Sequence, residues 1–295
     1  MTLIDIADGV AYIPGAVNIG VIKSGGEAVV VDTGLDKDAG REIRKALEDE
    51  GLKLKAIINT HSHADHYGGN DYLVRNLGAE VYAPEVEAGI IQNPILEPLY
   101  LFHGAAPIGS LRNRFVMAKP SPVHHILQPG KATIIGRELE IVPLPGHSPN
   151  QVGVLCDGVL FCADTVFSER VIDKYRVPVV QDVGSHLETL KRLMNTRHGL
   201  YVPSHTEPVG DIRPLAQLNL DATNRILEDV HGILSEPKTS EQVQAELCTR
   251  YGLDLDVVQQ YYLIHTTVMA YLGHLHETKR IKTELKGNNL YWKVV

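Results

Sequence analysis

The feature that most constrains this chain is an apolar strand that runs directly into a dense group of metal-binding side chains. Residues 56–60 form the strand, and His61, His63, Asp65 and His66 follow it. Imidazole nitrogens and carboxylate oxygens bind zinc and similar ions, and a pair at i and i+2 can converge on one ion. Asp65 and His66 can then turn toward a second ion. The alternative, a polar loop that is merely rich in histidine, leaves this density of ligands unexplained.

Three further side chains of the same kind follow later predicted strands. His147, Asp164 and His205 each come just after a short apolar run with the composition of a strand. A catalytic site along one edge of a sheet brings such positions together, so we expect these three beside the first group. Asp32 also ends an apolar run, before a glycine turn. Two interpretations of Asp32 stay open, a cap on the next helix and a hydrogen-bonding support for the metal ligands.

The order of the elements predicts a mixed α/β protein. Glycine and proline turns separate short strands near the amino terminus, and segments with a 3.6-residue apolar period follow. We assign residues 1–212 to one catalytic domain. The expected helices are 38–50, 70–77 and 186–197, and the expected strands are 10–13, 17–23, 27–32, 56–60, 81–83, 132–135, 138–144, 151–156, 159–162 and 200–204.

Residues 84–129 interrupt this pattern with frequent prolines among apolar and aromatic residues. A long connection without regular structure is uncommon in a compact enzyme and is often a lid or a binding loop. We therefore predict a lid-like insertion that sets specificity. His103, His124 and His125 lie in it. None of them has a partner at ligand spacing, so we interpret them as pocket or surface residues rather than metal ligands.

The carboxy-terminal part, residues 213–295, changes to helical patterns. Helices are expected over 215–233, from a capping box at 239–242, and over 254–278, followed by a hairpin of 281–285 with 290–295. Helices that end in a two-stranded wing are typical of a winged-helix-like domain, which suggests nucleic-acid contact. The alternative is a packing and dimerisation domain. Residues 235–295 carry equal numbers of basic and acidic side chains, which favours the alternative because phosphate binding needs a basic surplus.

Composition limits the class of protein. The 295 residues are 44% hydrophobic and 22% charged, with a net charge of −8, which is typical of a globular protein and gives no support for broad nucleic-acid or membrane attraction. The first residues include Asp5 and Asp8 and lack the pattern of a secretory signal, and no apolar run is long enough to span a membrane. The sparse cysteines, Cys156, Cys162 and Cys248, predict buried thiols and a cytoplasmic location.

In combination the motifs are far more specific than any one of them. In chain order they are Asp32-Thr-Gly, His61-x-His63-x-Asp65-His66, Gly146-His147-Ser148, Ala163-Asp164-Thr165 and Ser204-His205. This series resembles the metallo-β-lactamase superfamily over about residues 1–212, with every ligand position filled. The resemblance implies the four-layered αββα sandwich of that superfamily, with the site at the edge between its two sheets and a small helical domain appended.

The resemblance also implies how the ligands divide between two ions. One ion is held by His61, His63 and His147, the other by Asp65, His66 and His205, and Asp164 bridges them. The expected ions are two Zn²⁺, with iron or manganese as alternatives. Two ions roughly 3.5–4 Å apart can lower the pKa of a shared water toward about 7 and supply hydroxide for attack on a carbonyl or phosphoryl centre. Asp65 is expected to orient this nucleophile.

Departures from the superfamily's pattern narrow the choice of subfamily. Members that open β-lactam rings lack the bridging aspartate, whereas this chain has Asp164. Flavin-dependent diiron members carry glutamate where this chain has His63, and they add a flavodoxin domain. The full set of histidines and aspartates instead resembles hydroxyacylglutathione hydrolases, lactonases and nucleases of the superfamily.

Four functional hypotheses follow. The first is a dinuclear zinc hydrolase acting on a small ester, thioester or lactone. The second is a metal-dependent endoribonuclease or phosphodiesterase, and the third is a persulfide dioxygenase with a single iron on the His61 side. The fourth, a binding module without catalysis, is disfavoured because all the ligand residues are present. We expect a small-molecule substrate rather than nucleic acid and no membrane association, and a homodimer is left open.

Overall fold

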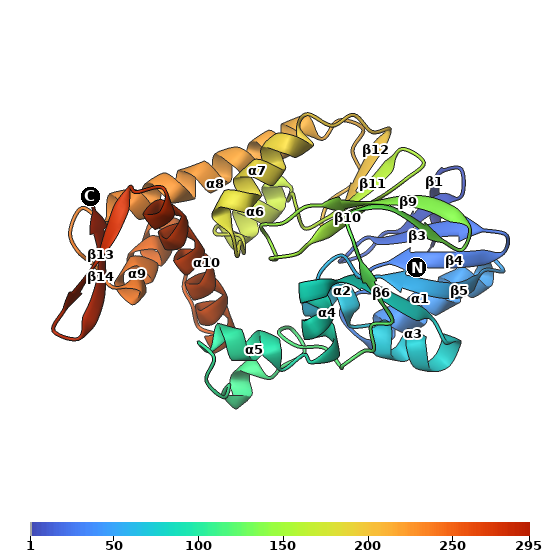
Figure 1. Ribbon diagram of the computed structural model, residues 1–295, viewed down its shortest axis with the longest axis horizontal. Helices are drawn as coiled ribbons and strands as arrows, with labels where there is room; N and C mark the ends of the chain where they lie inside the picture. Colours follow the sequence, from blue (N-terminus) through green and yellow to red (C-terminus); the bar gives the residue numbers. More distant parts are fainter. Residues whose placement is uncertain (1) are drawn as a thin grey trace.

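Two β-sheets pack face to face, and helices cover their outer sides (Figure 1). This computed structural model describes residues 2–295. Side chains alternate along a strand, so neighbouring residues enter different layers. In strand β2 (Val10–Ile13), Val10 and Tyr12 join the apolar layer between the sheets, while Ala11 and Ile13 join the layer beneath the helices. The predicted αββα sandwich is therefore confirmed.

The first sheet has the strand order β1 to β7. Its first four strands are antiparallel, and β4 to β7 are parallel and joined by helical crossovers, as parallel pairs require. Helix α1 begins at a cap in which the Asp36 carboxylate accepts the backbone N–H groups of Asp38 and Ala39. The bounds are β1 (Ile4–Ala7), β3 (Ile19–Ser24), β4 (Glu27–Val31), α1 (Lys37–Asp49), β5 (Lys53–Ile58), α2 (Ala64–Tyr67), α3 (Asn70–Leu77), β6 (Glu80–Pro84) and β7 (His125–Leu127).

The second sheet has the order β12-β11-β10-β9-β8. The hairpin predicted around Asp157-Gly158 is present, and both of these residues have positive φ angles, as such a two-residue turn requires. The pair β11 and β12 is parallel and is connected through two helices. The bounds are β8 (Gly130–Ile134), β9 (Arg137–Pro143), β10 (Val152–Cys156), β11 (Val159–Ala163), α6 (Glu169–Tyr175), α7 (Val183–Leu193) and β12 (Leu200–Pro203).

The insertion at 84–129 is more regular than the sequence predicts. It contains helices α4 (Glu85–Gln92) and α5 (Leu96–Leu101), the 3₁₀ turn η1 (Gly109–Leu111) and strand β7. The prolines that favoured an irregular segment do not prevent these helices because of where they stand. Pro84 is the N-cap of α4 and Pro98 lies in the first turn of α5, where backbone N–H groups have no partner within the helix.

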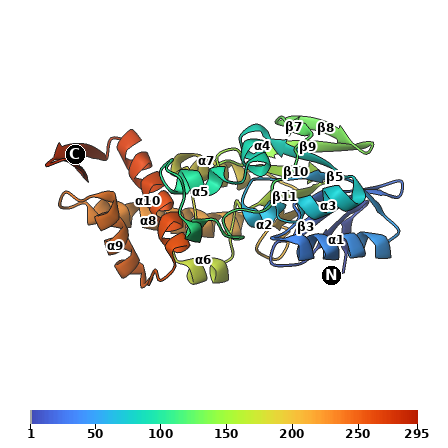
Figure 2. The same cartoon turned by 90° about the horizontal axis from the view of Figure 1, so that it is seen from below.

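The carboxy-terminal part consists of helices α8 (Arg213–Ile233), α9 (Ser240–Tyr251) and α10 (Val258–Glu277), followed by the hairpin β13 (Ile281–Lys286) and β14 (Asn289–Val294). It lies at the opposite end of the long axis from the sheets (Figures 1 and 2). The capping box at Thr239 is present. Helix α10 begins later than predicted, because Leu253 and Leu255 lie outside it and pack on the apolar core. The assignment to a winged-helix class stays a prediction.

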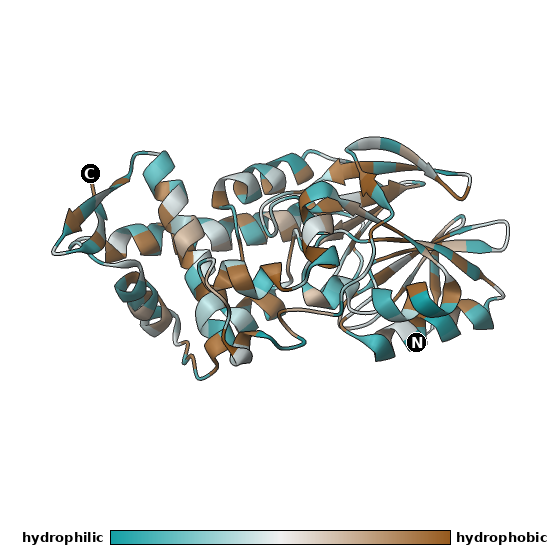
Figure 3. Cartoon of the chain, turned by 60° about the horizontal axis from the view of Figure 1, so that its bottom comes forward, coloured by the Kyte–Doolittle hydropathy of each residue, from teal (hydrophilic) through white to brown (hydrophobic). Residues whose placement is uncertain are grey.

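One apolar core runs from the outer face of the second sheet through the carboxy-terminal helices. It includes Leu160 and Tyr201 from the sheet, Leu190 from α7, and Val230 and Leu272 from α8 and α10. Helix α10 also contacts α5 and η1 of the insertion. Hydrophobic residues accordingly recur along the helices and the strands in Figure 3. The carboxy-terminal helices are thus joined to the second sheet and to the insertion by packing.

No helix in residues 2–295 combines the length and the apolar character needed to cross a membrane. The three cysteines, Cys156, Cys162 and Cys248, are buried free thiols, as the sequence predicts. Burial raises the pKa of the Cys162 thiol. A buried thiol in its neutral form is a poor nucleophile and a poor metal ligand, so Cys162 is not a substitute for the histidines near it.

Gly68 is required by the packing of the segment that follows the first ligands. A Cβ at this position would overlap the backbone carbonyl of Leu35. Because the obstacle is backbone rather than a flexible side chain, we expect Gly68→Ala to lower the free energy of unfolding by about 3 kcal/mol. Gly89→Ala is a matched control, since nothing lies within 4 Å of a Cβ there. Urea unfolding of both variants in a metal chelator tests this, and equal stability of the two would contradict it.

Candidate metal centre

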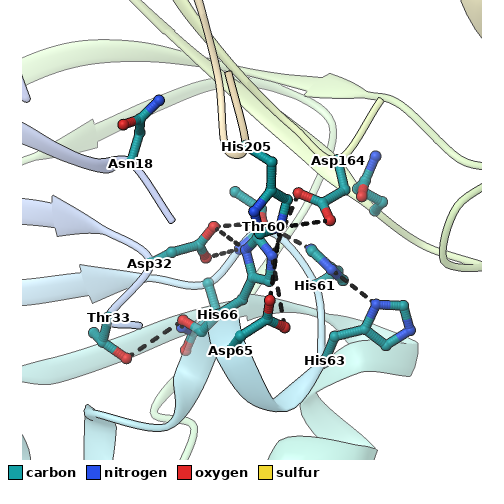
Figure 4. A network of polar contacts seen from close by, with 12 residues as sticks. Asn18, Asp32, Thr33, Thr60, His61, His63, Asp65, His66, Asp164 and His205 are labelled. Carbon is teal, nitrogen blue, oxygen red and sulfur yellow. Dashed lines mark hydrogen bonds and ion pairs between the residues drawn. The ribbon is translucent and has the colours of Figure 1, made fainter. Parts of the chain in front are cut away.

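The seven residues that the sequence singles out meet at one edge of the sandwich, and Figure 4 labels all of them except His147. They come from the segments that follow strands β5, β9, β11 and β12 and from helix α2. Within each of three groups, the candidate ligand atoms lie within 4.8 Å of one another. The groups are His61 with His63 and His147, His61 with His66 and Asp164, and Asp65 with His66 and His205.

The first group converges through one nitrogen from each ring. His63 Nδ1 lies 3.2 Å from His61 Nε2 and 2.9 Å from His147 Nε2. Three imidazole nitrogens at these separations can surround a single ion, because zinc–nitrogen bonds are about 2.0–2.1 Å long. His61 is buried and His147 is nearly so, while His63 lies on the more open side.

Asp164 lies between this group and the other. Its Oδ1 is 3.4 Å from His66 Nε2, and its Oδ2 is 3.1 Å from His205 Nε2 and 3.5 Å from His147 Nε2. Asp65 completes the second group, with its carboxylate 3.6 Å from His205 Nε2 and 3.9 Å from His66 Nε2. The two oxygens of Asp164 therefore face different sets of nitrogens, as a bridging carboxylate does.

Buried polar atoms without partners test whether these residues fit metal ions. Within residues 2–295, His66 Nε2 and Asp164 Oδ1 are buried and make no hydrogen bond of good geometry, although they lie 3.4 Å from each other. Leaving such groups unpaired costs about 1–3 kcal/mol each. Both atoms point into the centre of the cluster, where a cation would bind them. The chemistry of the donors also suits a divalent ion, because five imidazoles and two carboxylates are all ligands for zinc.

The outer nitrogens of four histidines are held by hydrogen bonds. His61 Nδ1 lies 3.0 Å from Thr60 Oγ1, and His66 Nδ1 lies 2.8 Å from Asp32 Oδ2. His147 Nδ1 and His205 Nδ1 face the backbone carbonyls of Val179 and Ala16, at 2.8 Å and 2.7 Å. When the outer nitrogen donates a proton in this way, the inner one keeps its lone pair for a metal.

Asp32 supports the cluster rather than capping a helix. Its Oδ2 contacts both His66 Nδ1 and Thr60 Oγ1, and its Oδ1 accepts the backbone N–H of Thr60 at 2.8 Å (Figure 4). The cap of helix α1 is Asp36 instead. These contacts favour the supporting interpretation of Asp32, which stays a prediction. Asp32 also has a φ angle of 65°, a left-handed conformation that aspartate tolerates better than most residues.

The pKa values in the cluster diverge. Burial lowers the pKa of the His61 and His63 imidazoles, and it lowers the pKa of His147 to about 4. Burial acts in the same direction on His205, but the neighbouring Asp164 outweighs it and raises the pKa of His205 to about 9. The neighbouring carboxylate thus favours the protonated form of His205, whereas burial favours the neutral form of His147.

Several residues of the site carry no signal that the sequence analysis used. Asn18 donates to the carbonyls of Pro203 and Thr206 and so holds the segment of His205 against the first sheet. From the other side, Gln181 Nε2 lies 3.5 Å from His63 Nε2 and donates to Tyr100 of α5. Asparagine and glutamine in loops are too common to stand out without knowledge of their neighbours. Tyr100 thus connects the insertion through Gln181 to His63, and the role of the insertion as a lid stays a prediction.

The three histidines of the insertion lie outside the candidate metal groups. His124 accepts the backbone N–H of Val81, and His125 pairs with Glu80. The ring of His103 packs edge-on against His265 of α10, with centroids 5.3 Å apart. The interpretation of these histidines as residues other than ligands is consistent with these contacts.

A family model described as the metallo-beta-lactamase superfamily matches residues 12–205, and the chain belongs to this family. Among curated relatives it is similar to the hydroxyacylglutathione hydrolase of Xanthomonas campestris, with 28% identity over 50% of this chain and 45% of the relative. The hydroxyacylglutathione hydrolase of Albidiferax ferrireducens is 32% identical over 48% of this chain and 44% of the relative. The chain thus spans less than half the length of these relatives.

Solved structures share the whole architecture. A metallo-beta-lactamase family protein of Thermus thermophilus superposes with a TM-score of 0.76 at 22% identity, covering 97% of this chain and 99% of that one. A beta-lactamase domain protein of Burkholderia ambifaria gives 0.75 at 20% identity, with 99% and 93% covered. At these identities the likeness concerns the fold alone. The family and the fold are thus shown, and the His/Asp groups are candidate metal sites within that fold.

Proposed function

We propose that this protein is a dinuclear zinc hydrolase that acts on a small ester, thioester or lactone. The observation that carries the proposal is the position of Asp164, whose two oxygens face the nitrogens of both ligand groups. When bound, two divalent ions supply a reactive nucleophile derived from water and polarise the group under attack. Iron or manganese are alternative occupants of the same donor set.

The chain's own residues have distinct roles in this proposal. One ion would be held by His61, His63 and His147 and the other by Asp65, His66 and His205, and Asp164 would supply a ligand to each. Asp65 keeps 39% of its side chain exposed, whereas Asp164 keeps 6%. Asp65 is therefore the carboxylate that can both bind and face an incoming substrate, and we assign it to orient the attacking oxygen and to take up its proton.

The substrate class rests on the relatives and on the surroundings of the site. The relatives are named hydroxyacylglutathione hydrolases, and this chain matches two of them over 50% and 48% of its length. Tyr100 and Gln181 present a hydroxyl and an amide beside His63, which suits hydrogen bonding to a carbonyl or a carboxylate. Helix α10 contacts α5 on that side, and we propose a small molecule as the substrate on the ground of the relatives.

Removing the metal tests the proposal. A chelator is expected to abolish hydrolysis of a panel of small esters, thioesters and lactones, and added zinc is expected to restore it, because no serine or cysteine nucleophile is assigned to the site. Elemental analysis of the purified protein is expected to give two metal ions per chain. The absence of metal-dependent hydrolysis across the whole panel would contradict the proposed substrate class. One iron per chain together with oxygen uptake would select the dioxygenase hypothesis instead.

No contact of the described residues favours a nuclease over this proposal. In the hairpin β13–β14, Lys293 pairs with Glu284, so part of its positive charge is already neutralised. The nuclease hypothesis therefore stays a prediction, to be tested by salt-dependent binding of single-stranded RNA. We keep the cytoplasm as the proposed compartment, on the ground of the buried free thiols.

A further inference from the structure

A buried carboxylate outside the candidate metal groups joins two of the ligand-bearing segments. Glu87 of α4 has no exposed surface. Its Oε2 accepts the backbone N–H of Ser62 at 3.0 Å and the Ser62 hydroxyl at 2.6 Å. Its Oε1 accepts the Ser148 hydroxyl at 2.5 Å and the backbone N–H of Asn150 at 2.9 Å. One side chain therefore receives four hydrogen bonds, two on each oxygen.

The donors flank metal ligands on both sides of the site. Ser62 stands between His61 and His63 after strand β5 of the first sheet, and Ser148 follows His147 in the segment between β9 and β10 of the second sheet. The candidate ligands of one ion thus come from two segments that belong to different sheets. The Glu87 carboxylate binds both segments, and packing fixes its position in helix α4.

The energetics make this an effective constraint. Hydrogen bonds to a carboxylate are about twice as strong as those between neutral groups, and burial strengthens them further. A carboxylate buried in this way requires its partners, because the cost of leaving it unpaired is high. Movement of either segment would break bonds on one oxygen. The separation of 2.9 Å between His63 Nδ1 and His147 Nε2 is therefore coupled to the geometry around Glu87.

We propose that Glu87 is a positioning residue for the metal centre. It fixes the spacing between the His61/His63 segment and the His147 segment, and so it sets the affinity for the ion that these three histidines would hold. The inference rests on the proposed function, since it concerns the geometry of the same metal centre. Glu87 makes no contact with the ligands' rings in this arrangement and acts through Ser62, Ser148 and Asn150.

Glu87→Gln is the sharpest variant. An amide has one accepting oxygen, while the backbone N–H groups of Ser62 and Asn150 approach opposite oxygens of Glu87 and cannot turn away. In either orientation of the amide, one of these N–H groups faces an NH₂ group. A second variant combines Ser62→Ala with Ser148→Ala. It removes one hydroxyl hydrogen bond to Glu87 from each segment, and it places no NH₂ group against a backbone N–H group. Glu85→Gln is the matched control, because Glu85 is exposed in the first turn of the same helix.

The experiment is a competition titration of the full chain with zinc and a chromophoric chelator, together with visible absorption spectra of the cobalt-loaded protein. We expect Glu87→Gln to weaken one of two zinc equivalents about 10- to 100-fold, the size typical of residues that orient metal ligands, and to change the cobalt spectrum. The double serine variant should weaken the same equivalent by about tenfold. Glu85→Gln should match the wild type.

The outcomes separate the inference from the proposed function. If the wild type binds no metal, the proposed function fails. If the wild type binds two ions and Glu87→Gln binds both with unchanged affinity and spectrum, Glu87 only stabilises the fold and the inference is overturned. If Glu87→Gln does not fold, the double serine variant decides by the same criteria. Both readouts report on the metal centre itself, so a loss of stability alone does not mimic the expected result.

Discussion

Replacing Asp164 by asparagine is expected to lower kcat/KM for a small ester or thioester about a thousandfold, since losing roughly 4 kcal/mol of metal-assisted stabilisation has that effect. The reason is that Oδ1 faces His66 while Oδ2 faces His205 and His147. An amide offers an oxygen to only one of these sides and carries no charge. Steady-state kinetics and metal content, measured on the same preparations, check this.

Asp173→Asn is the control for Asp164→Asn. Asp173 lies in α6, on the connection that follows Asp164, and its side chain is exposed. The same loss of one carboxylate charge there is expected to leave both kcat/KM and metal content unchanged. Full activity and two bound ions in the Asp164→Asn protein would refute the bridging role, and with it the division of the ligands into two groups around one shared carboxylate.

Asp32→Asn is expected to weaken metal binding about 10- to 100-fold. The backbone N–H of Thr60 requires the oxygen of the new amide, because that position accepts it at 2.8 Å in the native chain. The NH₂ group is then directed at His66 Nδ1, which lies 2.8 Å from Oδ2. His66 must accept there, so its proton moves to Nε2, the atom that would bind the metal.

This prediction has a spectroscopic signature. Nitrogen-15 NMR of the metal-free protein, at a pH high enough to make His66 neutral, is expected to show its proton on Nε2 in Asp32→Asn and on Nδ1 in the wild type. Competition titration is expected to show the weakened ion. The affected ion should be that of the Asp65, His66 and His205 group, whereas Glu87→Gln should affect the other. If Asp32→Asn retained the wild-type affinity for both ions, the hydrogen bond between Asp32 and His66 would not determine the ligand tautomer.

The sequence predicted most of the fold because its patterns are local. The apolar run of β4 and the capping box at Thr239 depend on neighbours a few residues away, and these elements appear where expected. Strand β5 is present too, but it spans Lys53–Ile58 rather than 56–60. The insertion is less predictable. Its prolines predict an irregular segment, yet Pro84 and Pro98 occupy positions at helix starts where proline is tolerated. The number of prolines alone therefore does not distinguish an irregular segment from a segment of short helices that begin at proline.

The amino-acid sequence alone is sufficient to single out the candidate metal ligands. Side chains such as His61 and Asp164 carry atoms that can bind metals, and their motifs can be recognised in the sequence without knowledge of the fold. Tertiary structure decided which residues hold those ligands in place. Glu85 and Glu87 both look like acids that favour a helix start, yet only Glu87 is buried with four donors. The physical reason is that a hydrogen bond depends on distance in space, and packing alone brings α4 to the two ligand segments.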